Sequence, residues 1–137
     1  MRDLKHLIAF ENLLQEANNE LVRQGKADGK RALGYTCYFM PEVLLDLPGC
    51  FAVRLRAPKC TSPDMATYYM SSRTCHYGRS LFERALEGGY NFLDADFGTE
   101  TCTVPCRFQE HLGYMDVIQN PDFFVTFTDV PFKRNQN

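Results

Sequence analysis

The chain has 137 residues, 45% of them hydrophobic, which suits one folded domain with a substantial core. Its formal net charge of −2, with both signs interspersed, argues against a nucleic-acid-binding surface. No apolar run approaches the roughly 20 residues of a membrane span, and the N-terminus has no signal-peptide pattern. We therefore expect a cytoplasmic protein that binds neither nucleic acid nor membrane.

The first part of the chain predicts a helix followed by a strand, a short helix and a second strand. Apolar residues at helical spacing predict an amphipathic helix over residues 1–25, which Gly25 ends. A strand is predicted over 32–39, and Pro41 is expected to begin a helix that runs to Leu47. A second strand is predicted over 50–58. This order indicates a βαβ unit with parallel strands.

The rest of the chain continues the alternation of helices and strands. Helices are predicted from residues 61–64 to about Arg73, over an apolar stripe that ends at Gly88, and from Pro105 to residue 118. Strands are predicted over 91–98 and 123–131. Asp94 and Asp96 alternate with apolar residues and are expected to face solvent or to cap the sheet edge. The pattern predicts a single α/β domain over 1–137, a Rossmann-like parallel sheet of about four strands with flanking helices, in a partial or truncated form.

Three of the six cysteines lie where predicted strands end or predicted helices begin. They are Cys75, Cys102 and Cys106. Ligands of parallel sheets bind beyond the carboxyl ends of the strands, and residues 35–39 and Cys102 fall there. Cys50 begins a strand and belongs to the opposite edge. Cys75 precedes a helix and Cys102 lies close to one, so backbone N–H groups could stabilise thiolates at both positions.

The cysteine pattern leaves several kinds of chemistry open. Without a secretory signal the thiols are expected to be free, buried or metal-bound. Cys75 and Cys102 could hold an iron–sulfur cluster, whereas Cys50 and Cys60 are best explained as buried thiols. A zinc site is an alternative, because Cys102 and Cys106 have the spacing of a ligand pair that Cys75, His76 or His111 could complete. A nucleophilic Cys37 or Cys75 beside a histidine is a weaker alternative.

Three segments, in their order, resemble one known family. GYTCYFMPEVLLDLPGCFAVRL is similar to the strand, Pro-Glu helix start and next strand of 2-hydroxyacyl-CoA dehydratases and benzoyl-CoA reductases. CHYGRSLFERALEGGYNFLDADFGTETC resembles their next segment, in which one cluster cysteine precedes an Arg-Ser helix and another follows a strand. FFVTFTDVPFK is similar to the following strand. The resemblance covers residues 30–133.

The resemblance implies an iron–sulfur subunit that passes one electron to an acyl-CoA thioester for radical dehydration or reduction. It implies a [4Fe-4S] cluster with Cys75 and Cys102 as ligands, and a substrate or cluster neighbourhood that includes Cys37, Pro41 and Glu42. It also implies a related subunit as heterodimer partner and an ATP-dependent iron–sulfur activator protein.

Family subunits are longer, and a second lobe supplies another cluster cysteine. The third ligand is therefore expected either to be Cys106 or to lie outside this chain, and we expect the chain not to be active alone. Thr103 stands where the family commonly has an acidic residue. The alternatives are a non-catalytic α/β module that binds a partner without a cluster, or a zinc-stabilised domain.

Overall fold

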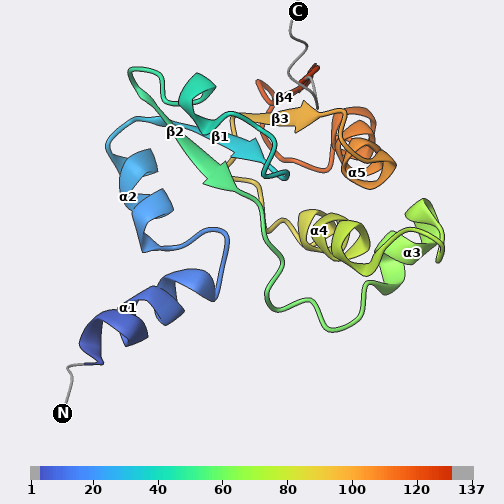
Figure 1. The fold of residues 1–137 in the computed structure, drawn as a ribbon, viewed down its shortest axis with the longest axis horizontal. Helices are drawn as coiled ribbons and strands as arrows, with labels where there is room; N and C mark the ends of the chain where they lie inside the picture. Colours follow the sequence, from blue (N-terminus) through green and yellow to red (C-terminus); the bar gives the residue numbers. More distant parts are fainter. Residues whose placement is uncertain (1–3, 131–137) are drawn as a thin grey trace, which may run out of the picture.

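Four parallel strands form the centre of the molecule. The computed structural model describes residues 4–130 and arranges one sheet in the order β2-β1-β3-β4 (Figure 1). The strands are β1 (Arg31–Tyr35), β2 (Cys50–Arg54), β3 (Ala95–Thr99) and β4 (Phe124–Thr128). Strand β1 pairs with β2 and β3, and β3 pairs with β4. This confirms the predicted fold class, a partial Rossmann-like α/β fold, although Pro131 of the predicted last strand lies outside the described residues.

Three helices pack their apolar residues against one face of this sheet. The three that follow β2 and β3 are α3 (Asp64–Met70), α4 (His76–Leu86) and α5 (Thr103–Tyr114). Phe82 of α4 and Phe108 of α5 are fully buried in the same cluster as Ala32 and Val53 of the sheet. A hydrophobic layer between helices and sheet therefore holds α4 and α5 in place.

The opposite face of β1 and β3 is covered by the segment that links β1 to β2. Met40 and Leu45 pack there against Leu33, Tyr35 and Ala95. The helix predicted from Pro41 to Leu47 is wrong, because this segment forms only a 3-10 turn over Glu42–Leu44. Leu45 directly follows the turn and is buried in the core.

The predicted first helix is also wrong, since two helices replace it: α1 (Lys5–Leu14) and α2 (Glu20–Ala27). Asn19 separates them. Its side-chain amide donates to the Leu13 carbonyl at the end of α1, and its Oδ1 accepts from the Val22 N–H at the start of α2. An asparagine that satisfies both helix ends favours a break over continuation.

Gly25 lies inside α2 and does not end it. The left-handed position belongs to Gly29, with φ +76°. A Cβ on Gly25 would stand 2.8 Å from Cε1 of Phe51, so this glycine allows α2 to approach β2. Its role is therefore close packing.

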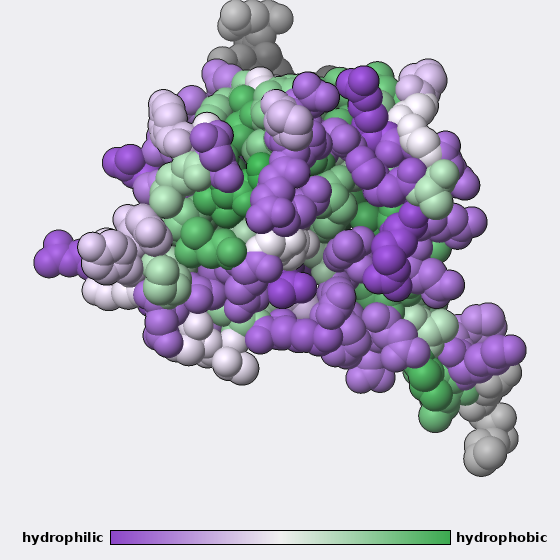
Figure 2. All heavy atoms as spheres, turned by 180° about the vertical axis from the view of Figure 1, so that it is seen from behind, coloured by the Kyte–Doolittle hydropathy of each residue, from purple (hydrophilic) through white to green (hydrophobic). Residues whose placement is uncertain are grey.

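Most of the large apolar side chains of α1 are exposed, and none of its residues is buried. Figure 2 shows apolar side chains of this helix as green spheres at the lower right. None of the helices within residues 4–130 is long and apolar enough to cross a membrane.

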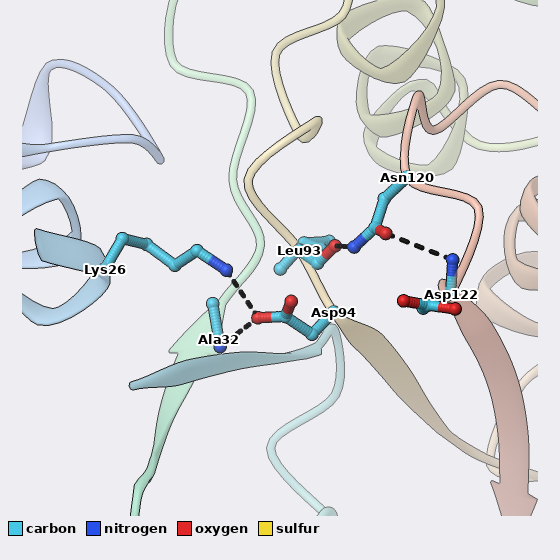
Figure 3. Close-up of polar contacts among 6 residues, drawn as sticks. All are labelled: Lys26, Ala32, Leu93, Asp94, Asn120 and Asp122. Carbon is cyan, nitrogen blue, oxygen red and sulfur yellow. Dashed lines mark hydrogen bonds and ion pairs between the residues drawn. The ribbon is translucent and has the colours of Figure 1, made fainter. Parts of the chain in front are cut away.

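The amino ends of β1 and β3 are joined through Asp94. Its Oδ2 accepts hydrogen bonds from the Ala32 N–H at 2.7 Å and from the Lys26 ammonium at 2.6 Å (Figure 3). Close by, Asn120 donates to the Leu93 carbonyl. Asp94 thus caps the sheet edge as predicted, but the same expectation for Asp96 is wrong, because its side chain is completely buried beneath α5.

Candidate functional site

The carboxyl ends of the four strands share one edge of the sheet, and the N-termini of α4 and α5 lie at this edge. Strand β1 ends at Tyr35, so Cys37 stands in the loop beyond it rather than in the predicted longer strand. Cys102 follows the end of β3 at Thr99. In parallel α/β sheets this edge is where ligands bind.

Cys75 is the N-cap residue of α4, and its side chain is exposed. Two residues later, the Tyr77 hydroxyl lies 3.3 Å from the Thr36 carbonyl and 3.4 Å from the Leu55 carbonyl. These carbonyls belong to the residues that directly follow β1 and β2. Tyr77 therefore ties the first turn of α4, and Cys75 with it, to the carboxyl edge.

Cys102 is the corresponding N-cap residue of α5 and is also exposed. This helix begins two residues before the predicted start at Pro105. A Cβ built on Gly78 of α4 would come within 2.2 Å of the Val104 Cγ1 of α5. Only glycine permits this approach, so the first turns of the two helices, each with a cysteine at its N-cap, are in close contact.

Within the described residues, no side-chain hydrogen bond caps the N-terminus of α4 at Cys75 or that of α5 at Cys102. The first-turn N–H groups of an uncapped helix are free to donate, and the positive end of the helix dipole favours an anion. The edge therefore offers two accessible sulfur atoms and two sets of backbone donors. This arrangement suits a bound group that carries negative charge and accepts hydrogen bonds.

Cys37 lies in a polar environment at the same edge. Its Sγ is 3.2 Å from the Thr101 Oγ1, directly before Cys102 in the chain. Burial alone would raise the pKa of the Cys37 thiol, but hydrogen bonds from Thr101, the Phe39 backbone and Thr99 together lower that pKa below its usual value. A thiol in this setting is a ready ligand or nucleophile.

Cys106 shares an open hollow of about 500 Å³ with Cys102, Glu100, Arg107 and Glu110. Its Sγ lies 3.9 Å from the Thr99 carbonyl. Burial, followed by the charges of Glu100 and Glu110, raises the pKa of the Cys106 thiol. Cys106 is therefore close to the site but is a poorer thiolate than Cys37.

Pro41 and Glu42 lie in the covering segment of the sheet. The Tyr35 hydroxyl donates to Oε1 of Glu42, and burial together with this bond raises the pKa of Tyr35 to about 12. The bond holds Glu42 near the end of β1. That Cys37, Pro41 and Glu42 contact a substrate stays a prediction.

The remaining cysteines and histidines are placed elsewhere or have other partners. Cys50 begins β2 and so lies at the opposite edge of the sheet, as expected, and Cys60 is half-buried. His76 Nδ1 lies 3.0 Å from the Ser80 hydroxyl, and the His111 ring lies 5.1 Å from that of Phe82. Within residues 4–130 no three His, Cys, Asp or Glu side chains are grouped to hold a single metal ion, so the alternative zinc site is not assembled there.

Residues 37–137, most of the chain, match the family model of the 2-hydroxyglutaryl-CoA dehydratase D-component. The chain belongs to this family. The match confirms the resemblance found in the sequence. No curated protein matches the chain. A dehydratase D-component is one part of a complex, so membership implies a partner subunit.

The donor set of this D-component family member fits an iron–sulfur cluster in type and in position. Cys75 and Cys102 are exposed thiols at neighbouring helix N-termini, and backbone N–H groups face the same edge. Cluster sulfides accept such hydrogen bonds. Because cluster cysteines bind different iron atoms, they need not be grouped as closely as the ligands of a single ion.

Some residues of the site were not identified from the sequence. Tyr77 and Thr101 act through contacts with strand ends distant in the chain, and no local pattern marks them. The close contact at Gly78 is one that the sequence could indicate, because a glycine inside a helix often marks a tight packing contact.

Proposed function

We propose that this chain is an iron–sulfur subunit of a 2-hydroxyacyl-CoA dehydratase, and that Cys75 and Cys102 are ligands of a [4Fe-4S] cluster. The observation that carries the proposal is that two exposed cysteine N-caps lie at the carboxyl edge of the sheet, on helix first turns that touch where Gly78 meets Val104. A [4Fe-4S] cluster held there would supply single electrons to an acyl-CoA thioester.

The residues of the chain provide the surroundings of that chemistry. Tyr77 anchors α4 to the ends of β1 and β2, which holds Cys75 in place. The first-turn N–H groups of α4 and α5 compensate the negative charge of bound sulfur. Cys37, with its lowered pKa, lies near Thr101 at the loop that carries Cys102 and, with Pro41 and Glu42, forms the proposed substrate side of the site.

We further propose the partners that this chemistry requires. A related subunit completes the site, either by its own residues or by contacts that enclose the substrate. An ATP-dependent iron–sulfur activator delivers the electron. The exposure of Cys75 and Cys102 supports both proposals, because a site open on this edge can be approached by another protein.

The proposal is tested by anaerobic reconstitution with iron and sulfide. The wild-type chain should become brown and contain iron and acid-labile sulfide, and Cys75→Ala or Cys102→Ala should lose most of both. Cys50→Ala, at the opposite edge, is the matched control and should keep both. Colourless wild-type protein that folds stably would instead support a non-catalytic α/β module.

A further inference from the structure

A buried polar pair joins α5 to the sheet. Asp96 of β3 and Gln109 of α5 are both completely buried, and the Gln109 Nε2 donates to the Asp96 Oδ2 at 2.8 Å. The surrounding residues of α5, Phe108 and Leu112, are apolar and already fasten the helix to the core. The polar pair is therefore an addition to a sufficient hydrophobic contact.

Two glycines make room for this pair. Gly34 stands opposite Asp96 on β1, and a Cβ there would lie 2.7 Å from the Asp96 Oδ1. Gly98 is two residues further along β3, and a Cβ there would lie 2.2 Å from the Gln109 Oε1. Because strand glycines weaken a sheet, their use on both sides of the pair indicates that this volume is reserved for polar atoms.

Stability alone does not account for the pair. Among the described residues, Asp96 Oδ1 and Gln109 Oε1 have no hydrogen-bond partner, and an unmatched buried polar atom costs free energy. Apolar residues of similar volume would cost less. What the pair provides is a directional contact, since a hydrogen bond constrains the rotation of α5 about its axis more closely than apolar packing does.

The helix that the pair constrains carries Cys102 at its N-cap, two turns before Gln109. We propose that Asp96 and Gln109 are positioning residues that fix the rotation of α5 on β3 and thereby the position of Cys102 relative to Cys75. This rests on the proposed function, in which the two sulfur atoms must fit one bound group. Cys75 belongs to α4, which the pair does not contact in this way, so it serves as an internal reference.

The test measures the alkylation rate of each cysteine in the metal-free chain by peptide mass spectrometry. Three variants are compared: Gln109→Leu, the apolar pair Asp96→Val with Gln109→Leu, and Asp96→Asn, whose amide oxygen still accepts from Gln109. Circular dichroism establishes that each is folded. Gln109→Leu alone leaves the buried Asp96 carboxyl without its partner. If that variant fails to fold, the apolar pair still gives the answer.

We expect the apolar pair to change the alkylation rate of Cys102 about fivefold or more. The rate of Cys75 should stay within about twofold of wild type, because only the rotation of α5 on the sheet is altered. Asp96→Asn should restore the wild-type rate at Cys102. An unchanged rate at Cys102, an equal change at both cysteines, or an Asp96→Asn variant that behaves like the apolar pair would each overturn the proposal. Since the assay needs no cluster, a failure to bind iron would count against the proposed function alone.

Discussion

The Sγ of Cys37 lies 3.2 Å from the Oγ1 of Thr101 and links the loop after β1 to the loop that leads to Cys102. The two residues are 64 positions apart in the chain. The contact connects the proposed substrate side of the site with the proposed cluster side. It also makes the Cys37 thiol sensitive to a residue outside its own loop.

Thr101→Val should raise the pKa of Cys37, because the hydroxyl that donates to the thiolate is lost while the shape is kept. The pH dependence of Cys37 alkylation, followed by mass spectrometry, measures this shift. Thr101→Ser keeps a hydroxyl and is the matched control. A titration of Cys37 that is identical in the valine and serine variants would show that Thr101 has no influence on it.

Gly78→Ala should destabilise the chain by about 1–3 kcal/mol, because its methyl group collides with Val104 and overpacks the contact between α4 and α5. Chemical denaturation measures the free energy of unfolding. Adding Val104→Ala should recover part of the loss.

Gly113→Ala in α5 is the control, since its Cβ would meet Val125 at an ordinary 3.7 Å. There alanine should stabilise by about 0.5–1 kcal/mol through its higher helix propensity. Equal effects of the two alanine substitutions would contradict the close helix contact.

Asp94→Ala should destabilise the chain by about 1–3 kcal/mol, because the Ala32 N–H loses its side-chain partner and Lys26 its counter-ion. Lys26→Met should cost at most about 1 kcal/mol, since the ion pair is partly exposed. Thermal unfolding distinguishes the two. A larger loss for Lys26→Met than for Asp94→Ala would assign the contact to the ion pair instead.

Burial raises the pKa of Asp96 from its ordinary 3.8 to about 6, despite the opposing bond from Gln109. Folding therefore favours the neutral form more strongly than the unfolded chain does, and Asp96 ionises in the fold only as the pH rises through about 6. The stability it contributes is complete below pH 3.8 and is lost as the pH rises through about 6. Asp96→Asn cannot ionise and should not show this loss.

The difference in unfolding free energy between Asp96→Asn and wild type should therefore grow in favour of the variant as the pH rises, by an amount on the order of 3 kcal/mol between about pH 4 and pH 8. Urea denaturation across this range measures it. A difference that stays constant with pH would mean that Asp96 is not buried as a carboxylic acid.

Much of the fold follows from local patterns in the sequence. Alternating helix and strand patterns predict the parallel sheet, and the rule that strand ends share an edge separates Cys102 from Cys50. Cys75 was correctly placed before a helix. These predictions succeed because each depends on an element's own residues.

The errors concern residues whose environment is set by distant parts of the chain. The alternating pattern predicts that Asp96 lies on the polar side of its strand. In the structure α5 covers Asp96, and Gln109 of that helix donates a hydrogen bond to its carboxyl group. The break at Asn19 depends on one side chain that bonds to two helix ends. The helix predicted from Pro41 to Leu47 is reduced to one 3-10 turn, and Leu45 directly after it packs against residues of β1 and β3.

Whether Cys75 and Cys102 hold one [4Fe-4S] cluster is decided by Mössbauer spectroscopy of the chain reconstituted with ⁵⁷Fe under anaerobic conditions. This method distinguishes a cluster from adventitious iron. Wild type and Cys50→Ala should show a [4Fe-4S] signal that is absent from Cys75→Ala and from Cys102→Ala. A wild-type spectrum without that signal, or a signal that survives both substitutions, would contradict it.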